Sequence, residues 1–291
     1  MIKNYLELSK SEKIKLIEFI NRDKVSKSSF EEIDKQMLSE DYGFGKGVII
    51  KIDEAEVSGR VVIVLKECSQ KGIAYVINLD ISEKIDDNEK VVSDIITEAK
   101  QIAKKNGAEE IFLGVSDHKI IRILNSLNWE KKYSAIKMIL EDRKIRYSPL
   151  DIIKLSKDNK IEYLKIYNDA FSEVPNGASL TEKEVDEYIK NADDNNLYYI
   201  VTVDNDMVGF LQVYIEDGVG EFDLGLIKAA RGKKYGKRLL ETAIKFLNTK
   251  EVTKIRLSVV TNNKLAYDMY KSRGFRQSEL ISDWFELNKK K

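Results

Sequence analysis

The sequence predicts an α/β (α+β) protein that contains two tandem copies of one domain. Segments with helical periodicity follow segments with the alternation of strands, and the same order of elements occurs twice along the chain. Matching positions recur at nearly constant offsets, which are 146 from Trp129 to Phe275, 144 from Leu113 to Leu257 and 147 from Leu79 to Leu226. Such offsets indicate a duplication, and the alternative is two unrelated α/β domains whose spacing agrees by chance.

The first half begins with two amphipathic helices, at 9–21 and 28–38. Three strands follow, at 47–52, 60–65 and 72–79. The remaining predicted elements are a helix at 88–105, a strand at 110–115, a helix at 118–127 and a strand at 134–141. A charged segment precedes Pro149, so we place the boundary near Ile145 and expect domains at 1–145 and 146–291.

The second half repeats this order. Two helices are predicted at 157–171 and 181–190, and Thr181 with Glu184 matches a capping box. Strands are predicted at 197–203, 207–215 and 220–227, with Asp204-Asn205 as a hairpin turn. A helix containing Leu239 to Leu247, a strand at 253–260 and a helix from Asn263 to Arg273 complete the pattern.

The composition excludes several classes of function. The 291 residues, of which 43% are hydrophobic and 34% charged, suit a soluble globular protein with two domains. The 49 basic residues balance the 49 acidic ones, so we expect neither nucleic acid nor a membrane as partner. A single cysteine, Cys68, excludes an internal disulfide, and a single histidine, His118, argues against a metal site. Without a secretory signal or an apolar span, the expected location is the cytoplasm.

A short basic loop, Arg231-Gly232-Lys233-Lys234-Tyr235-Gly236-Lys237, joins a predicted strand to a helix N-terminus. The first N–H groups of a helix have no partners within the helix, and the helix dipole places partial positive charge there. Glycines let the backbone approach a phosphate, and four cationic side chains add attraction. The pattern indicates an anion site, with a solvated basic turn as the alternative.

About thirty residues later a second pattern occurs, N-x-x-A-x-x-x-Y-x-x-x-G-F, formed by Asn263, Ala266, Tyr270, Gly274 and Phe275. Together with the R-x-x-x-x-G loop, it resembles the acetyl-CoA-binding half of the GNAT N-acetyltransferases. This sequence departs from the family at Lys234, where a glycine is usual. The resemblance implies that each domain is a GNAT-like domain with a mixed, mostly antiparallel central sheet flanked by helices.

The resemblance implies an acetyl-CoA-dependent N-acetyltransferase that uses acetyl-CoA as co-substrate and no metal. The acceptor would be a small-molecule or peptide amine, and we expect a monomer or a homodimer. In the family, a bulge separates two central strands, and the pantetheine arm lies between them. The cofactor-binding residues implied here are Leu224, Gly225, Leu226, Arg231, Gly232, Lys233, Lys234, Tyr235, Gly236, Lys237, Asn263 and Tyr270.

Three residues are candidates for catalysis. Tyr270 matches the family tyrosine that protonates the leaving thiolate, although a lone tyrosine on an amphipathic helix is also a common core residue. Glu221 and Asp223 are candidate bases for the amine, on one face of their strand and opposite Phe222. A solvent-facing strand has the same alternation, so the choice stays open. Asn263 caps its helix, contacts the cofactor, or does both.

The first half lacks the corresponding site residues. The loop from Asp80 to Asp87 contains no glycine and is largely acidic, and Leu124 stands where the offset of 146 places Tyr270. An acidic loop repels phosphate. We therefore expect residues 1–145 to be a degenerate copy without a phosphate loop.

Two functions from different classes remain. The leading one is the N-acetyltransferase, and the other is a catalytically silent GNAT-like protein that binds a partner or senses a CoA ester. A nucleotide-binding phosphate loop is excluded by spacing, since Gly232 and Gly236 are four apart and Arg238, not a hydroxyl residue, follows Lys237.

Overall fold

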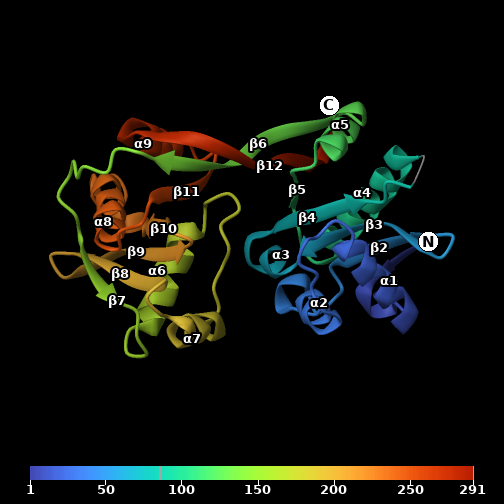
Figure 1. Ribbon diagram of the computed structural model, residues 1–291, viewed down its shortest axis with the longest axis horizontal. Helices are drawn as coiled ribbons and strands as arrows, with labels where there is room; N and C mark the ends of the chain where they lie inside the picture. Colours follow the sequence, from blue (N-terminus) through green and yellow to red (C-terminus); the bar gives the residue numbers. More distant parts are fainter. Residues whose placement is uncertain (85–86, 291) are drawn as a thin grey trace. The chain divides into compact units, whose positions relative to one another are not determined.

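The computed structural model describes residues 1–84 and 87–290, and the chain forms two compact units (Figure 1). Unit 1 comprises Met1–Tyr133 together with the segment from Ser282 onward, and unit 2 comprises Ser134–Ile281. Each unit contains a mixed sheet with helices packed on its faces. The predicted α/β class with a duplicated order of elements is confirmed.

Unit 1 has the strand order β1-β2-β3-β4-β5-β12. Its strands pair antiparallel, except that β4 and β5 are parallel. Its elements in chain order are β1 (Ile2–Asn4), η1 (Tyr5–Glu7), α1 (Lys10–Asn21), α2 (Phe30–Met37), η2 (Glu40–Tyr42), β2 (Val48–Asp53), β3 (Glu56–Val64), α3 (Lys66–Lys71), β4 (Ile73–Ile81), α4 (Asn88–Lys105), β5 (Glu110–Val115) and α5 (His118–Ser126).

Unit 2 has the order β12-β6-β11-β10-β9-β8-β7. Strands β10 and β11 pair parallel, whereas the pairs β9–β10, β6–β11, β7–β8 and β8–β9 are antiparallel. Its elements are β7 (Asp151–Lys154), α6 (Lys160–Phe171), α7 (Glu182–Asn191), β8 (Asn196–Val203), β9 (Asp206–Glu216), β10 (Val219–Leu226), η3 (Lys228–Ala230), α8 (Tyr235–Thr249), β11 (Lys254–Val260) and α9 (Lys264–Arg273). The order strand, long helix, parallel strand, helix is therefore present in both units.

Two strands, β6 (Trp129–Leu140) and β12 (Phe275–Lys290), pass from one unit into the other. Residues 135–140 of β6 pair with β11 in unit 2, and residues 283–286 of β12 pair with β5 in unit 1. The units thus exchange their last strands, and the division differs from the boundary expected near Ile145. Periodicity identifies a strand but not the sheet that receives it, so a local pattern does not reveal such an exchange.

The sheet of unit 2 is covered on both faces. Leu197, Val201 and Leu211 belong to the apolar cluster around α8 and α9. Their neighbours in sequence, Tyr198 and Phe210, belong to the cluster around α6 and α7. This alternation places the two helix pairs on opposite faces of the sheet, as the period of a strand requires.

The predicted helices are present, with bounds that differ by a few residues at most from those expected. The capping box of Thr181 and Glu184 is also confirmed. The sequence missed β1, α3, β7 and β12, and β6 begins at Trp129 rather than Ser134. Three of these elements are short, and β12 follows the last sequence motif.

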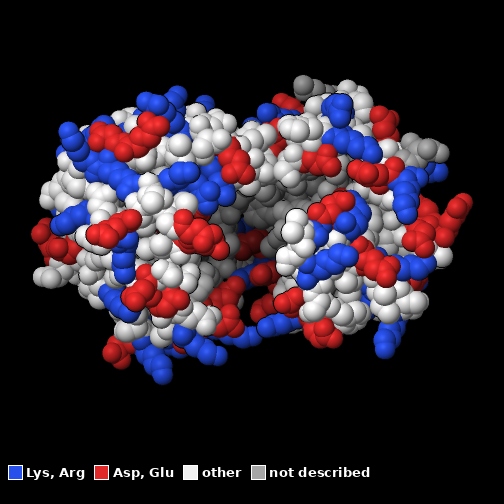
Figure 2. Space-filling model, viewed as in Figure 1, with Lys and Arg blue, Asp and Glu red and all other residues white. Residues whose placement is uncertain are grey.

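Acidic and basic side chains are interspersed on the face that Figure 2 shows, in keeping with the balanced composition. Within the described residues, no helix combines the length and the apolar character that a membrane span requires. No group of three or more potential metal ligands occurs among the described residues either.

Candidate functional site

The two central strands of unit 2 pair over a short stretch and then separate. Parallel pairing of β10 with β11 runs from Val219 to Glu221, and the described residues show no β11 partner for β10 beyond that point. On their other edges, β10 stays paired with β9 as far as Leu226, and β11 stays paired with β6 as far as Val260. The result is a fork, defined here as residues 222–226 of β10 facing residues 257–260 of β11.

The fork contains the three predicted contact residues Leu224, Gly225 and Leu226. Their main chain towards β11 is outside the sheet ladder, so its polar groups are available to an extended ligand. Gly225 is required by packing, because a Cβ there would lie 2.7 Å from the Phe210 ring and 2.9 Å from the Ala170 Cβ. A glycine thus lets α6 approach β10 closely.

The basic loop follows the fork and leads into α8. Gly232 has φ of +78°, and among the described atoms none lies within 4 Å of the position of a Cβ there. Lys234 precedes α8 with φ of 65°, in the left-handed region that disfavours side chains with a Cβ. The family's usual glycine at this position therefore suits the local backbone, and Lys234 introduces strain.

The N-terminus of α8 is not capped by the side chain of its own N-cap residue. The side chain of Lys234, the N-cap residue, accepts no hydrogen bond from the first turn. Gly236 lies in that turn, and a Cβ on it would meet only the Met269 Sδ, at 3.4 Å. Unsatisfied N–H groups next to positive charge form an anion site.

The side chain of Arg231 contacts α6. Its guanidinium donates to the Ala170 carbonyl at 2.9 Å and to the Glu173 carboxylate at 3.0 Å. Lys228 and Arg231 both pair with Glu173 and hold the pKa of its carboxyl below the usual value. The structure therefore gives Arg231 a role in fixing the loop against α6.

Tyr270 lies in α9 and is buried, with 8% of its surface exposed. Its ring packs against Phe275, with the ring centroids 5.9 Å apart. Burial, and secondarily the negative charge of Asp223, raise the pKa of its hydroxyl well above the usual value. The phenol is protonated at neutral pH, and among the described residues no hydrogen bond is recorded for its hydroxyl.

The two candidate bases differ in their surroundings. Glu221 forms an ion pair with Arg256 of β11 at the last paired position of the strands. The Asp223 residue is exposed, yet the surrounding protein and, secondarily, the charge of Glu221 raise the pKa of its carboxyl to about 6. A carboxyl that is open to water on one side, with a pKa close to neutrality, suits a general base better than a carboxylate held by arginine.

The predicted common face of the two carboxylates is confirmed, since Phe222 between them is buried on the α8 side. On the α6 side, Asp223 lies opposite Gln212 of β9. The Tyr214 hydroxyl donates to the Gln212 Oε1 at 2.7 Å, and the Gln212 Nε2 donates to the Tyr163 hydroxyl at 2.7 Å. This network was missed, although polar residues alternating along β9 were a signal for it.

Asn263 is the N-cap of α9, where its side-chain oxygen accepts a hydrogen bond from the Ala266 N–H at 3.4 Å. Asn263 thus caps its helix, which is the first of the roles expected for it. Of the remaining loop residues, Lys237 lies with its Nζ 5.4 Å from the centre of the Tyr147 ring. Lys233 and Tyr235 flank Lys234 between Gly232 and Gly236.

Unit 1 differs at the corresponding positions. The helix α4 starts after Asp87, whose carboxylate accepts a hydrogen bond from the Lys90 N–H at 3.0 Å. Ile85 and Asp86 of the predicted acidic loop lie outside the described residues. Leu124 is fully buried in α5, where α9 carries Tyr270.

Comparisons with known proteins give one family. The family model described as "Acetyltransferase (GNAT) family" matches residues 161–275, which include the fork, the basic loop and Tyr270. The mycothiol acetyltransferase of Streptomyces avermitilis is 28% identical over 123 residues, which are 40% of this chain and 39% of that protein. The matched segment thus spans well under half of that relative.

Solved structures resemble the chain over nearly its whole length. A GCN5-related N-acetyltransferase from Sphaerobacter thermophilus is 12% identical with a TM-score of 0.60, and the match covers 98% of this chain and 94% of that one. A tandem GNAT protein from the clavulanic acid biosynthesis pathway is 9% identical with a TM-score of 0.57, covering 98% and 97%. At these identities the structures show the fold alone. Residues 161–275 of this chain therefore match the GNAT acetyltransferase family, and the chain as a whole shares the fold of these solved structures.

Proposed function

We propose that unit 2 is an acetyl-CoA-dependent N-acetyltransferase that transfers an acetyl group directly to an amine. The observation that carries this proposal is the fork between β10 and β11, which continues into an uncapped N-terminus of α8. The fork offers unpaired main-chain groups to an extended arm, and the α8 terminus offers N–H donors to a pyrophosphate. The name of the mycothiol acetyltransferase supports acetyl as the acyl group.

The residues that would hold the donor are the fork main chain at 224–226 and the loop N–H groups from Gly232 to Lys237. Arg231 would act indirectly, by fixing the loop against α6. Lys233 and Lys237 would add attraction for the pyrophosphate. When bound, acetyl-CoA supplies a thioester carbonyl that an amine can attack, with release of a thiol.

Asp223 and Tyr270 would handle the protons of this transfer. Asp223, with a pKa of about 6, is ionised at neutral pH and accepts the proton that the amine loses. Tyr270 keeps its proton at neutral pH and donates it to the leaving sulfur. Because the charge of Asp223 contributes to the raised pKa of Tyr270, protonation of Asp223 makes Tyr270 a stronger acid when the thiolate forms.

The charge around Asp223 favours a cationic acceptor. Glu221 and Asp223 share a face, and Arg256 offsets only one of these two carboxylates. Burial raises the pKa values of Tyr188 and Tyr214; the charge of Asp223 is the next cause for Tyr214 and a minor one for Tyr188, so both tyrosines lie near Asp223. A small-molecule or peptide amine is therefore the proposed acceptor class, with neither nucleic acid nor membrane as partner, and the cytoplasm as expected location.

The test is calorimetric titration of the full chain with acetyl-CoA, followed by a screen of amines that detects the released thiol. Binding of one acetyl-CoA per chain and thiol release with an amine would support the enzyme. Tight binding without turnover on any amine would favour the silent protein that senses a CoA ester, a reading to which the strained Lys234 lends some support. Absence of binding would contradict both functions.

A further inference from the structure

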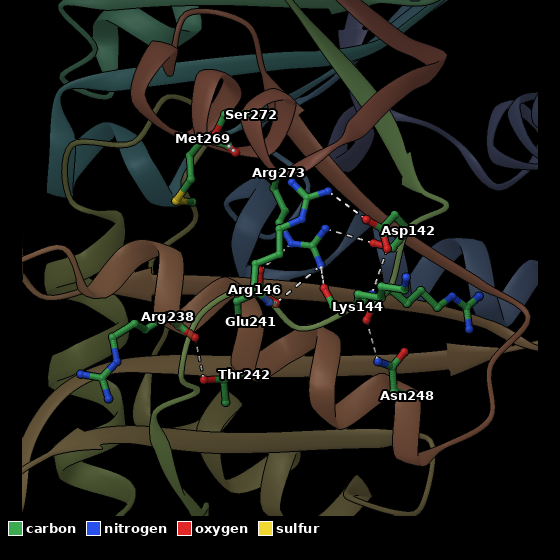
Figure 3. A network of polar contacts seen from close by, with 11 residues as sticks. Asp142, Lys144, Arg146, Arg238, Glu241, Thr242, Asn248, Met269, Ser272 and Arg273 are labelled. Carbon is green, nitrogen blue, oxygen red and sulfur yellow. Dashed lines mark hydrogen bonds and ion pairs between the residues drawn. The ribbon is translucent and has the colours of Figure 1, made fainter.

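A small pocket lies beside the phosphate loop, between α8, α9 and the segment that follows β6. Its volume is about 30 Å³, and its lining residues are Arg146, Tyr147, Lys237, Leu240, Glu241, Met269, Ser272 and Arg273. Figure 3 shows five of these side chains, those of Arg146, Glu241, Met269, Ser272 and Arg273, together with the neighbouring polar network. Of these lining residues, the proposed function uses Lys237 alone, for its attraction to the pyrophosphate.

The floor of the pocket is a buried ion pair. The Arg273 Nε donates to the Glu241 Oε1 at 2.5 Å, and the exposed fractions of the two side chains are 3% and 0%. Arg273 also donates to the carbonyls of Asp142, at 3.0 Å, and Lys144, at 2.8 Å, and Glu241 accepts from the Arg146 N–H at 3.2 Å. The floor is therefore neutral, rigid and fully hydrogen-bonded (Figure 3).

The rim of the pocket carries an excess of positive charge. Arg146 pairs with Asp142 at 2.9 Å, but both side chains are roughly half exposed, so this pair is weak and exchangeable. The Nζ of Lys237 lies over the ring of Tyr147. Two flexible cations above a neutral floor match a doubly charged phosphate monoester, which arginine binds through two parallel hydrogen bonds.

The pocket is close to the N-terminus of α8. Lys237 is the third residue of that helix, and Glu241 lies four residues later, a rise of about 6 Å along the axis. That span is similar to the distance between two phosphates on the same ribose. A ligand with its pyrophosphate at the start of α8 can therefore reach the pocket with a second phosphate.

We propose that this pocket binds the 3′-phosphate of coenzyme A, with Arg146 as the residue that distinguishes coenzyme A from 3′-dephospho-coenzyme A. The inference rests on the proposed function. It assigns a ligand contact to the segment that joins β6 to β7, outside the residues 161–275 that match the family.

The experiment compares binding of coenzyme A and 3′-dephospho-coenzyme A to the full chain and to Arg146→Met. Methionine retains the main-chain N–H that bonds to Glu241, and circular dichroism verifies folding. We expect coenzyme A to bind the wild type more tightly by about fivefold to tenfold, and the variant to lose this preference without weaker binding of the dephospho form. The matched control is Lys245→Met, which removes the charge of an exposed residue on the same helix and should keep the preference.

The other outcomes separate the two proposals. Equal affinity of the wild type for both ligands would overturn the pocket assignment and leave the proposed function intact. An equal loss for both ligands in Arg146→Met would also overturn it, because Arg146 would then act on the loop. Binding of inorganic phosphate that depends on Arg146, without a preference between the two ligands, would assign the pocket to free phosphate instead. If neither ligand binds the wild type, both proposals fail.

Discussion

The starts of α4 and α8 occupy equivalent places in the two units but satisfy their first N–H groups differently. In α4, the Asp87 carboxylate of the chain itself accepts a hydrogen bond from the Lys90 N–H. In α8, the N-cap is Lys234, and its side chain caps nothing. The comparison shows that one change of residue type decides whether a helix end is closed by its own chain or left for a ligand.

The strand β10 and the helix α9 of unit 2 also carry candidate site residues that their counterparts in unit 1 lack. Counted from the first paired residues of β4 and β10, Ile73 and Val219, Ile77 of unit 1 corresponds to Asp223. Leu124 corresponds likewise to Tyr270. By contrast, the N-caps of α5 and α9, Asp117 and Asn263, are both present. Unit 1 has retained residues that shape the fold and lacks those proposed for chemistry.

The largest expected effect tests whether the halves at 1–145 and 146–291 are independent. A fragment of residues 146–291 lacks β6, and with it the buried Ile136, Met138 and Leu140. Burial of three such side chains contributes about 5–9 kcal/mol, similar to the whole stability of a domain. We expect no cooperative thermal transition for 146–291, whereas 134–281, which retains the part of β6 that pairs with β11, serves as the matched control. A stable 146–291 that binds acetyl-CoA like the full chain would contradict the exchange of strands.

Replacing Tyr270 with phenylalanine gives the next largest effect and tests the contrast with Leu124. The ring and its packing against Phe275 remain, and only the hydroxyl is lost. We expect kcat to fall by about 10² to 10⁴, as for loss of a general acid, with unchanged affinity for acetyl-CoA. Steady-state kinetics on an acceptor found in the screen, with calorimetry, provides the measurement. Turnover within twofold of the wild type would transfer the role to water.

The contrast between Asp223 and Ile77 predicts a pH dependence. As the proposed base, Asp223 must be ionised, so kcat/KM should rise through about pH 6 and the acidic limb should vanish in Asp223→Asn. At pH 8 we expect the variant to be slower by about 10². Glu221→Gln is the control and should keep the limb. An unchanged limb in Asp223→Asn would assign it to another group.

The raised pKa of the Asp223 carboxyl also predicts that the stability of the folded protein depends on pH. Its pKa is higher in the folded protein, so the ionised form is disfavoured by folding. The destabilisation by the ionised carboxylate is absent below pH 3.8, the pKa of the carboxyl in the unfolded chain. It is complete above about pH 6, the pKa in the folded protein. Asp223→Asn should therefore raise the melting temperature at pH 8 and leave it unchanged at pH 3.5, which calorimetric scans can measure.

A carboxylate at the start of α8 would reproduce the situation of α4. Gly236→Asp places one in the first turn, where the helix tolerates it well but a phosphate would be repelled. We expect the full chain to bind one acetyl-CoA. In the variant, the affinity for acetyl-CoA should fall tenfold or more, which corresponds to about 1.4 kcal/mol. Gly236→Ala controls for the added Cβ, which meets only the flexible Met269, and should change affinity little. Equal effects of the two variants would point to sterics rather than charge.

The smallest effect concerns the strain at Lys234. Lys234→Gly removes the Cβ from a residue with φ of 65°, and should stabilise the folded protein by up to about 1 kcal/mol. Lys234→Ala removes the charge but retains the Cβ, and should give no such gain. Chemical denaturation compares them. If alanine stabilises as much as glycine, the lysine charge and not the backbone is the cause.

Much of the fold could be predicted from the sequence because local periodicity determines which segments form helices and strands. The helices α4 and α8 are examples, with apolar residues at helical spacing. The exchange of β6 and β12 could not be predicted, because it depends on pairing partners far apart in the chain. β12 also lies largely beyond the last motif.

For the candidate site, the motif pointed to the loop and to Tyr270, and its departure at Lys234 coincides with the strained residue. The motif did not reveal that Arg231 is held by α6 or that Glu221 is paired with Arg256. Both contacts join elements that no local pattern connects. The raised pKa of Asp223 likewise depends on the three-dimensional surroundings of the carboxyl.

The exchanged strands also impose an order on folding during synthesis. Leu113 of β5 pairs with Phe285 of β12, about 170 residues later, so the sheet of unit 1 is incomplete while most of unit 2 is being translated. During that time β5 has an open edge, which is prone to pairing with other chains. Contacts of such long range slow folding. Chaperone dependence of the nascent chain should therefore be concentrated in unit 1, although that unit emerges from the ribosome first.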